Sequence, residues 1–161
     1  MRTLGVPYDE GMEVGIMVEV PSAVAVADQL ARAVDFFSIG TNDLTQYVMA
    51  ADRGNARVAD LASALQPAVL RLVRDAARAA HDADIWIGMC GELAGNPLAA
   101  PLLVGLGLDE LSMSAPSIPA VKAAVRRFPL AEAQRLATAA LALDSAEAVA
   151  DFLQQAVAGE R

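Results

Sequence analysis

The hydrophobic positions of the chain fall into four short apolar runs, and each run ends in a polar segment punctuated by glycine. A stretch with apolar residues at helical spacing follows each run. The runs predict strands at residues 15–20, 36–39, 85–89 and 108–113. The remaining periodic stretches predict helices at residues 22–33, 44–49, 67–82, 97–106, 117–127, 131–142 and 145–158. Ser22, Ser117 and Ser145 stand where they could cap three of these helices.

This alternation of strand and helix predicts an α/β fold with a parallel sheet and right-handed crossovers. Two architectures fit four such units. The first is an open four-stranded sheet. The second is half of a TIM (β/α)₈ barrel, because a complete barrel needs about 250 residues and this chain has 161. A half barrel would leave two strand edges unpaired, and such edges favour self-association or pairing with another chain.

Composition narrows the classes of function. The chain is 55% hydrophobic, enough for one sizeable core, and its net charge of −8 argues against a nucleic-acid surface. A single cysteine excludes an internal disulfide and is typical of a reducing cytoplasm. No apolar run approaches the ~18 residues of a membrane-spanning helix, and the first residues lack the apolar region of a signal peptide. We therefore expect a cytoplasmic protein that inserts into no membrane.

Two acidic residues, Glu19 and Asp43, stand at the ends of adjacent predicted strands. In parallel α/β folds, ligands bind at the carboxyl ends of the strands. A pair of carboxylates in that position suits Mg²⁺, which uses few protein ligands and completes its shell with substrate oxygens. Either acid alone would more simply cap a helix or face solvent. The pair, with one member preceded by Gly-Thr-Asn, favours a magnesium site.

Other candidate residues accompany the two acids. Asn42 offers an amide, Gly40 lets the backbone approach a ligand closely, and Arg53 in a Gly/Asn-rich loop could hold a phosphate through two hydrogen bonds. Cys90 directly follows the third predicted strand, and Gly88 and Gly91 flank the Met89–Cys90 pair. These glycines favour exposure to a ligand, so the thiol could act as a nucleophile or a proton donor. Against these readings, a lone arginine is usually a solvated surface residue, and a lone cysteine is usually a small buried hydrophobe. His81 lies near a helix end and is predicted to be structural.

Several segments together resemble enzyme I of the bacterial sugar phosphotransferase system, the family of phosphoenolpyruvate–protein phosphotransferases. They are IMVE at 16–19, FFSIGTNDLTQY at 36–47, DRGN at 52–55 and GMCGELAG at 88–95, and the resemblance continues through GLDELSMS at 107–114. Pyruvate phosphate dikinases and phosphoenolpyruvate synthases share the first acid and the NDLTQ pattern. The DRGN loop and the CGELAG run favour enzyme I.

The resemblance implies a fold and a set of roles. The whole chain, residues 1–161, would be the C-terminal half of a TIM barrel of the phosphoenolpyruvate/pyruvate-binding type, with strands five to eight. Glu19 and Asp43 match magnesium ligands. Asn42, Asp43 and Arg53 match residues of the substrate site, and Cys90 matches the proton donor to the enolpyruvate methylene carbon. The family transfers phosphate from phosphoenolpyruvate to its own histidine and then to the carrier protein HPr.

The family's phosphorylated histidine domain and first barrel half do not match any part of this sequence, so the chain alone is expected to be inactive and to associate with itself or with the other half. Two further functions remain open. One is a Mg²⁺-dependent aldolase on a related barrel, which would have no evident need of Cys90. The other is a non-catalytic binding or dimerisation module.

Overall fold

The computed structural model describes residues 5–58 and 61–158. Its strands are β1 (Ile16–Val18), β2 (Phe36–Gly40), β3 (Trp86–Cys90) and β4 (Glu110–Leu111). Its α-helices are α1 (Pro21–Ala25), α2 (Ala27–Leu30), α3 (Thr41–Met49), α4 (Pro67–Asp82), α5 (Ala100–Gly105), α6 (Ile118–Val125), α7 (Leu130–Ala140) and α8 (Ala146–Ala158). Short 3₁₀ helices are η2 (Ala31–Ala33), η4 (Leu93–Gly95) and η5 (Ala115–Ser117).

The four strands form one parallel sheet in the order β1-β2-β3-β4, so the predicted α/β fold with a parallel sheet is confirmed. The register pairs Val18 with Ile39 and Gly40 with Cys90. Because all three pairings are parallel, all four carboxyl ends lie at one edge of the sheet. This edge is where the sequence predicts the site.

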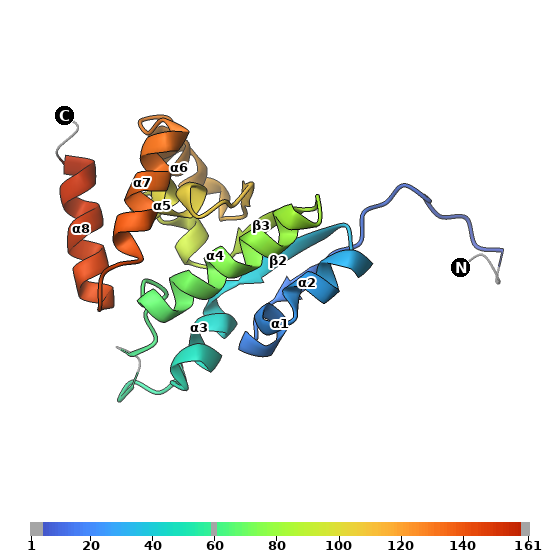
Figure 1. Ribbon diagram of the computed structural model, residues 1–161, viewed down its shortest axis with the longest axis horizontal. Helices are drawn as coiled ribbons and strands as arrows, with labels where there is room; N and C mark the ends of the chain where they lie inside the picture. The colour runs from blue at the N-terminus through green and yellow to red at the C-terminus, as the bar shows by residue number, and fades with distance from the viewer. Residues whose placement is uncertain (1–4, 59–60, 159–161) are drawn as a thin grey trace.

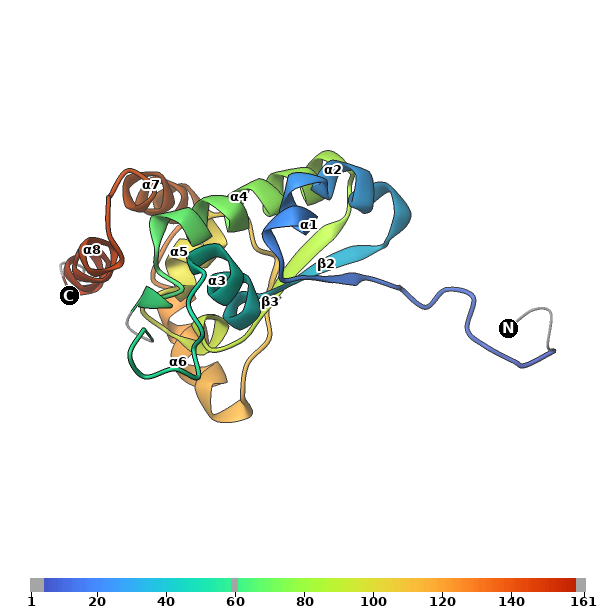
Figure 2. The same ribbon diagram turned by 90° about the horizontal axis from the view of Figure 1, so that it is seen from below.

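The two faces of the sheet differ. The face that carries Phe37, Ile39 and Ile87 is fully buried, and α1, α2 and α4 lie along it in Figures 1 and 2. Side chains alternate between faces along a strand, so Met17, Ser38 and Cys90 share the opposite face. None of these three is fully buried, and Met17 is 49% exposed. We call this side the open face.

Two aromatic rings stack on the open face, at the end of the sheet opposite the carboxyl ends of the strands. The rings of Phe36 and Trp86 lie 4.3 Å apart at an angle of 10°. The Trp86 Nε1 donates a hydrogen bond of 3.1 Å to Glu13, in the segment before β1. Figures 1 and 2 show that this segment extends away from the sheet, and the Glu13 contact holds its last residues against β3.

The first predicted helix is wrong in its continuity. Residues 22–33 form three short pieces, and Val26, with φ −122° and ψ 22°, separates the first from the second. Ser22 does not cap the first piece: Val20 is the N-cap, and Pro21 occupies the first turn, where its fixed φ suits a helix. Ser117 is at an N-cap, but its hydroxyl makes no capping bond and instead lies 3.2 Å from the Ser114 hydroxyl. Ser145 does cap its helix, since its Oγ accepts from the Ala148 N–H at 3.1 Å.

Two other boundaries differ from the prediction and matter for the site. The helix predicted at 44–49 begins at Thr41, directly after β2, so Asn42 and Asp43 lie in its first turn. The strand predicted at 108–113 is only Glu110–Leu111. No helix within the described ranges combines the length and hydropathy needed to cross a membrane.

Helix α7 packs against α5 at a glycine. A Cβ placed on Gly105 would collide with the backbone carbonyl of Ala133. In a helix interior, alanine is more stable than glycine by about 1 kcal/mol. Overpacking a side chain against backbone, however, costs about 1–3 kcal/mol and occasionally more. We therefore expect Gly105→Ala to lower the free energy of unfolding by about 1–2 kcal/mol, measured by denaturant titration of the purified chain. Gly11→Ala is the control, because its Cβ would meet nothing closer than 3.5 Å. Equal effects of the two substitutions would contradict the close α5–α7 contact.

Candidate functional site

Residues from three neighbouring strands form one row across the open face. Gly40 pairs with Cys90, and Glu19 lies one residue beyond Val18, whose partner Ile39 precedes Gly40. A Cβ on Gly40 would lie 2.9 Å from the Glu19 Oε2 and 3.3 Å from the Met17 Sδ. The absence of a side chain at Gly40 therefore lets the Glu19 carboxylate lie over the end of β2, beside the start of α3.

The Cys90 thiol occupies the same row and is partly exposed. Its Sγ lies 3.5 Å from the carbonyl oxygen of Ile39 and 3.7 Å from the Met17 Sδ. Cys90 forms no disulfide. The predicted exposure of Cys90 agrees with its partial burial, since the thiol lies on the open face near the ends of the strands.

Two hydrogen bonds connect the first turn of α3 to the turn after β3. Thr41 is fully buried, and its hydroxyl donates to the Cys90 carbonyl at 3.0 Å. The Asn42 Oδ1 accepts a long hydrogen bond of 3.5 Å from the Glu92 N–H. Between these contacts Gly91 has φ +106°, where an added Cβ would collide with the Thr41 hydroxyl. The two hydrogen bonds thus fix Asn42 relative to Cys90.

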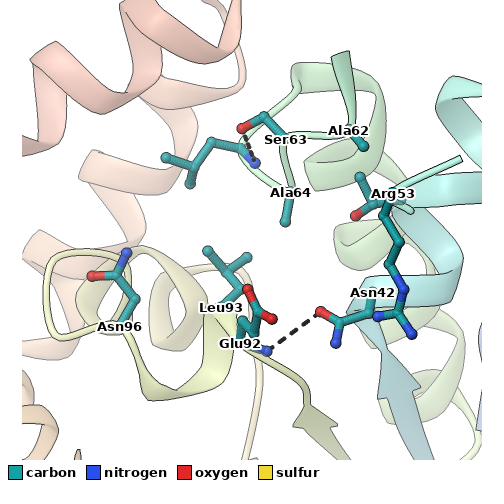
Figure 3. Close-up of a pocket in the computed structure, with 10 residues that line it drawn as sticks. Asn42, Arg53, Ala62, Ser63, Ala64, Glu92, Leu93 and Asn96 are labelled. Carbon is teal, nitrogen blue, oxygen red and sulfur yellow. Dashed lines mark hydrogen bonds between the residues drawn. The ribbon is translucent and has the colours of Figure 1, made fainter. Parts of the chain in front are cut away.

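Arg53 comes from the loop after α3. Its backbone N–H donates to the Gln46 side-chain oxygen at 3.3 Å, and the Asp52 carboxylate accepts from the Gly54 backbone N–H at 2.8 Å. Figure 3 shows the Arg53 guanidinium beside the Asn42 amide, at the wall of a cavity. The loop therefore returns this arginine to the strand ends although it is eleven positions from Asn42 in sequence.

The cavity has a volume of about 880 Å³ and opens to solvent. The residues around it are Asn42, Thr45, Arg53, Ala62, Ser63, Ala64, Leu65, Glu92, Leu93 and Asn96. A smaller cavity of about 400 Å³ shares Asn42 and Glu92 with it and extends toward Met113 and Ser114. Glu19 and Cys90 line neither cavity, whereas Asn42 lines both and is held to the turn after β3 by its bond with Glu92.

Glu19 and Asp43 are the candidate oxygen donors for a magnesium ion. Glu19 and Asp43 are both partly exposed, and Asp43 lies at the N-terminus of α3, where a negative charge is favoured. Among residues 5–58 and 61–158 there is no group of three or more acidic, histidine or cysteine side chains arranged as metal ligands. Two carboxylates suit Mg²⁺, which keeps several waters and takes oxygens from a phosphorylated substrate.

Two residues of this region were not predicted from the sequence, Thr41 as a tether and Thr45 as part of the cavity wall. They lie four positions apart, on one side of a helix that begins at Thr41. The prediction began this helix at residue 44, so the shared face was not recognised. His81 lies outside the region: its Nε2 is 3.0 Å from the Asp109 Oδ2, on the surface, as its structural role predicts.

Comparison with known proteins gives a consistent result. Residues 1–130 match the family described as PEP-utilising enzyme, PEP-binding domain. The chain is 52% identical over 151 residues to the phosphoenolpyruvate-protein phosphotransferase of Geobacillus stearothermophilus, an alignment that covers 94% of this chain and 26% of that protein. It is 58% identical over 141 residues to the protein of that name from Haloferax volcanii, with 88% of this chain and 25% of the relative covered. The chain thus spans about a quarter of the length of these relatives.

Proposed function

Because this chain belongs to the PEP-utilising enzymes and matches their PEP-binding domain, we propose that it supplies the phosphoenolpyruvate site of a phosphoenolpyruvate–protein phosphotransferase. The enzyme passes phosphate from phosphoenolpyruvate to a protein histidine and from there to HPr, for sugar uptake. The single observation that carries the proposal is the row of Glu19, Gly40 and Cys90 at the strand ends, with Asn42 fastened beside it. The single free cysteine is in keeping with a cytoplasmic enzyme.

Each residue of the site has its own role in the proposed reaction. Glu19 and Asp43 would hold Mg²⁺, which neutralises the charge of the substrate's carboxylate and phosphate. The Asn42 amide and the Arg53 guanidinium bind the phosphorylated substrate and orient it. When the phosphorus–oxygen bond breaks, the phosphoryl group leaves for the histidine nitrogen and an enolate remains. Cys90 then donates its thiol proton to the methylene carbon, which gives pyruvate and a thiolate.

We further propose that the four strands are strands five to eight of a TIM barrel. Half-exposed Met17 and the Phe36–Trp86 stack on the open face suit residues that would line a barrel interior. β1 and β4 each lack a second neighbour in this sheet. The complementary strands would come from sequence outside these 161 residues, and the chain would pair with that half or with a second copy.

A full-length chimera tests the function. In it, this chain replaces the matching quarter of the Geobacillus stearothermophilus relative, and phosphoenolpyruvate-dependent labelling of HPr is measured. We expect transfer, and we expect Arg53→Lys to lower kcat/KM by about 10- to 100-fold, because hydrogen bonds to charged groups are worth about 1.5–3 kcal/mol.

Arg57→Lys is the matched control, since Arg57 is exposed in the same loop but does not line the cavity. The proposal fails if the folded chimera transfers no phosphate. An equal loss in both arginine variants would remove Arg53 from the substrate site.

A further inference from the structure

The open face carries a second carboxylate that has no role in the proposed reaction, that of Glu110 in β4. Glu110 pairs with Gly88 of β3, and a Cβ added to Gly88 would collide with the Glu110 Oε2. The carboxylate therefore lies over β3, on the face where Cys90 stands two residues further along the strand. Glu19 reaches over β2 across Gly40 in the same way, from the other edge of the sheet.

Ser112 connects this carboxylate to the position of the thiol. Leu111 pairs with Met89, and the Ser112 backbone N–H donates to the Met89 carbonyl at 2.8 Å. In this register Ser112 stands beside Cys90, on a strand about 4.7–4.9 Å away. The Ser112 hydroxyl donates a hydrogen bond of 2.6 Å to the Glu110 Oε1. A hydroxyl both donates and accepts hydrogen bonds, so Ser112 can pass a proton between a carboxyl group and a thiolate.

Asp109, the acid next to Glu110, is engaged elsewhere. Its Oδ2 accepts from the Ile87 backbone N–H at 2.9 Å and lies 3.0 Å from the His81 Nε2. Side chains alternate between the faces of a strand, so Asp109 and Glu110 point to opposite sides of the sheet. Of these two acids, Glu110 is therefore the one that shares a face with the thiol of Cys90.

The proposed reaction creates a need for such a connection. Cys90 gives its proton to the methylene carbon and is left as a thiolate beneath the bound pyruvate. The product covers the sulfur from the side on which the substrate binds, so a new proton has to arrive along the sheet. Glu110 and Ser112 are both exposed in this chain, whereas Cys90 is partly buried. Water therefore reaches the carboxylate more readily than the thiol.

We propose that Glu110 and Ser112 form a proton relay that restores the Cys90 thiol. A hydronium ion of the solvent protonates the Glu110 carboxylate. The carboxyl hydrogen then moves to the Ser112 oxygen as the Ser112 hydroxyl hydrogen moves to the Cys90 sulfur. The broken S–H bond is thereby formed again, one solvent proton is consumed for each pyruvate, and no electrons are transferred. Both residues act through Cys90, so the inference rests on the proposed function for the role of that thiol.

Exchange of the methyl hydrogens of pyruvate tests the relay. The full-length chimera is incubated with pyruvate and Mg²⁺ in heavy water, where the Cys90 thiolate removes a methyl proton. The same proton returns to the carbon unless the thiol first exchanges with solvent. The relay carries out this exchange beneath the bound substrate, so pyruvate gains deuterium at a rate that NMR measures. Circular dichroism checks the folding of each variant.

We expect Glu110→Gln and Ser112→Ala each to slow methyl deuteration by about 100-fold, the lower end of the contribution of a positioned proton-transfer group. Pyruvate formation in a single turnover uses the proton already on Cys90. The ratio of the deuteration rate to the single-turnover rate should therefore fall by nearly the same factor, whereas a merely structural loss would lower both rates together. Glu110→Asp and Ser112→Thr keep the functional groups and should recover most of the deuteration.

Glu147→Gln is the matched control, because Glu147 is exposed on α8, which lies away from the sheet in Figure 1. It should deuterate pyruvate at the parent rate. Cys90→Ala should deuterate none, which would tie the exchange to the thiol. Parent-like deuteration in Glu110→Gln, or an equal loss of both rates without recovery in Glu110→Asp, would overturn the relay. A folded parent chimera that deuterates no pyruvate would overturn it as well.

The two proposals fail separately. If the chimera transfers phosphate to HPr and Glu110→Gln deuterates pyruvate at the parent rate, only the relay is wrong. If the chimera deuterates pyruvate in a way that depends on Glu110 and labels no HPr, only the phosphotransferase function is wrong.

Discussion

Replacing Cys90 with alanine is expected to leave phosphoenolpyruvate binding nearly intact and to slow pyruvate formation by about 10²- to 10⁴-fold, the usual range for loss of a general acid. The thiol lies on the open face, where it contacts the Ile39 carbonyl and the Met17 sulfur. Its proposed role begins only when the enolate is protonated, so its loss removes stabilisation of the transition state and not ground-state binding. Rapid-quench measurement of pyruvate in the full-length chimera gives the rate, and calorimetry gives the affinity.

Cys90→Ser separates proton donation from packing. Serine preserves the size and the position of the group, but its hydroxyl is a much weaker acid than a thiol, so this variant should be nearly as slow as alanine. Met89→Leu is a neighbouring control, because Met89 is fully buried on the helix-covered face of the same strand. Pyruvate formation at the parent rate in Cys90→Ala would mean that the thiol is structural.

Glu19→Gln and Asp43→Asn should each weaken Mg²⁺-dependent phosphoenolpyruvate binding by more than about 100-fold. Loss of even an outer-shell partner of a metal lowers metal affinity or activity by about 10- to 100-fold, and these two residues are proposed as direct ligands. The amide variants keep the size of the side chains and remove one negative charge each. Titration calorimetry of the chimera at several Mg²⁺ concentrations measures the effect.

Asp28→Asn controls for the change in net charge, since Asp28 is exposed on α2, away from the strand ends. Its affinity should equal that of the parent. Undiminished Mg²⁺-dependent binding in either Glu19→Gln or Asp43→Asn would remove that residue from the metal site.

The sheet and the meeting of strand ends were predictable from the sequence because both follow from local signals. β-rich runs such as residues 36–39 are short, apolar and bounded by glycine, and helices between them require parallel strands. Parallel strands place Glu19, Gly40 and Cys90 at a common edge without further information. Their order along the chain was therefore enough to predict the row.

The boundaries depended on contacts that a sequence pattern does not contain. α3 begins at Thr41 and not at residue 44. The hydroxyl of Thr41 donates to the carbonyl of Cys90, a partner 49 positions away in the sequence. β4 contains only two residues, Glu110 and Leu111, which pair with Gly88 and Met89 of β3. Thr45 drew no attention because burial without a partner is a property of tertiary packing, and nothing in the residue type indicates it.

The stacked Trp86 has a consequence for optical work on this protein. It is the single tryptophan of the chain, and it lies half-buried on the open face, against Phe36 and hydrogen-bonded to Glu13. Its intrinsic fluorescence therefore reports from one known point. A partner that covers the open face would remove water from the indole and shift its emission to shorter wavelength, whereas a ligand at the strand ends would leave the spectrum almost unchanged. Docking of a complementary half and occupation of the site can thus be followed separately in one unlabelled sample.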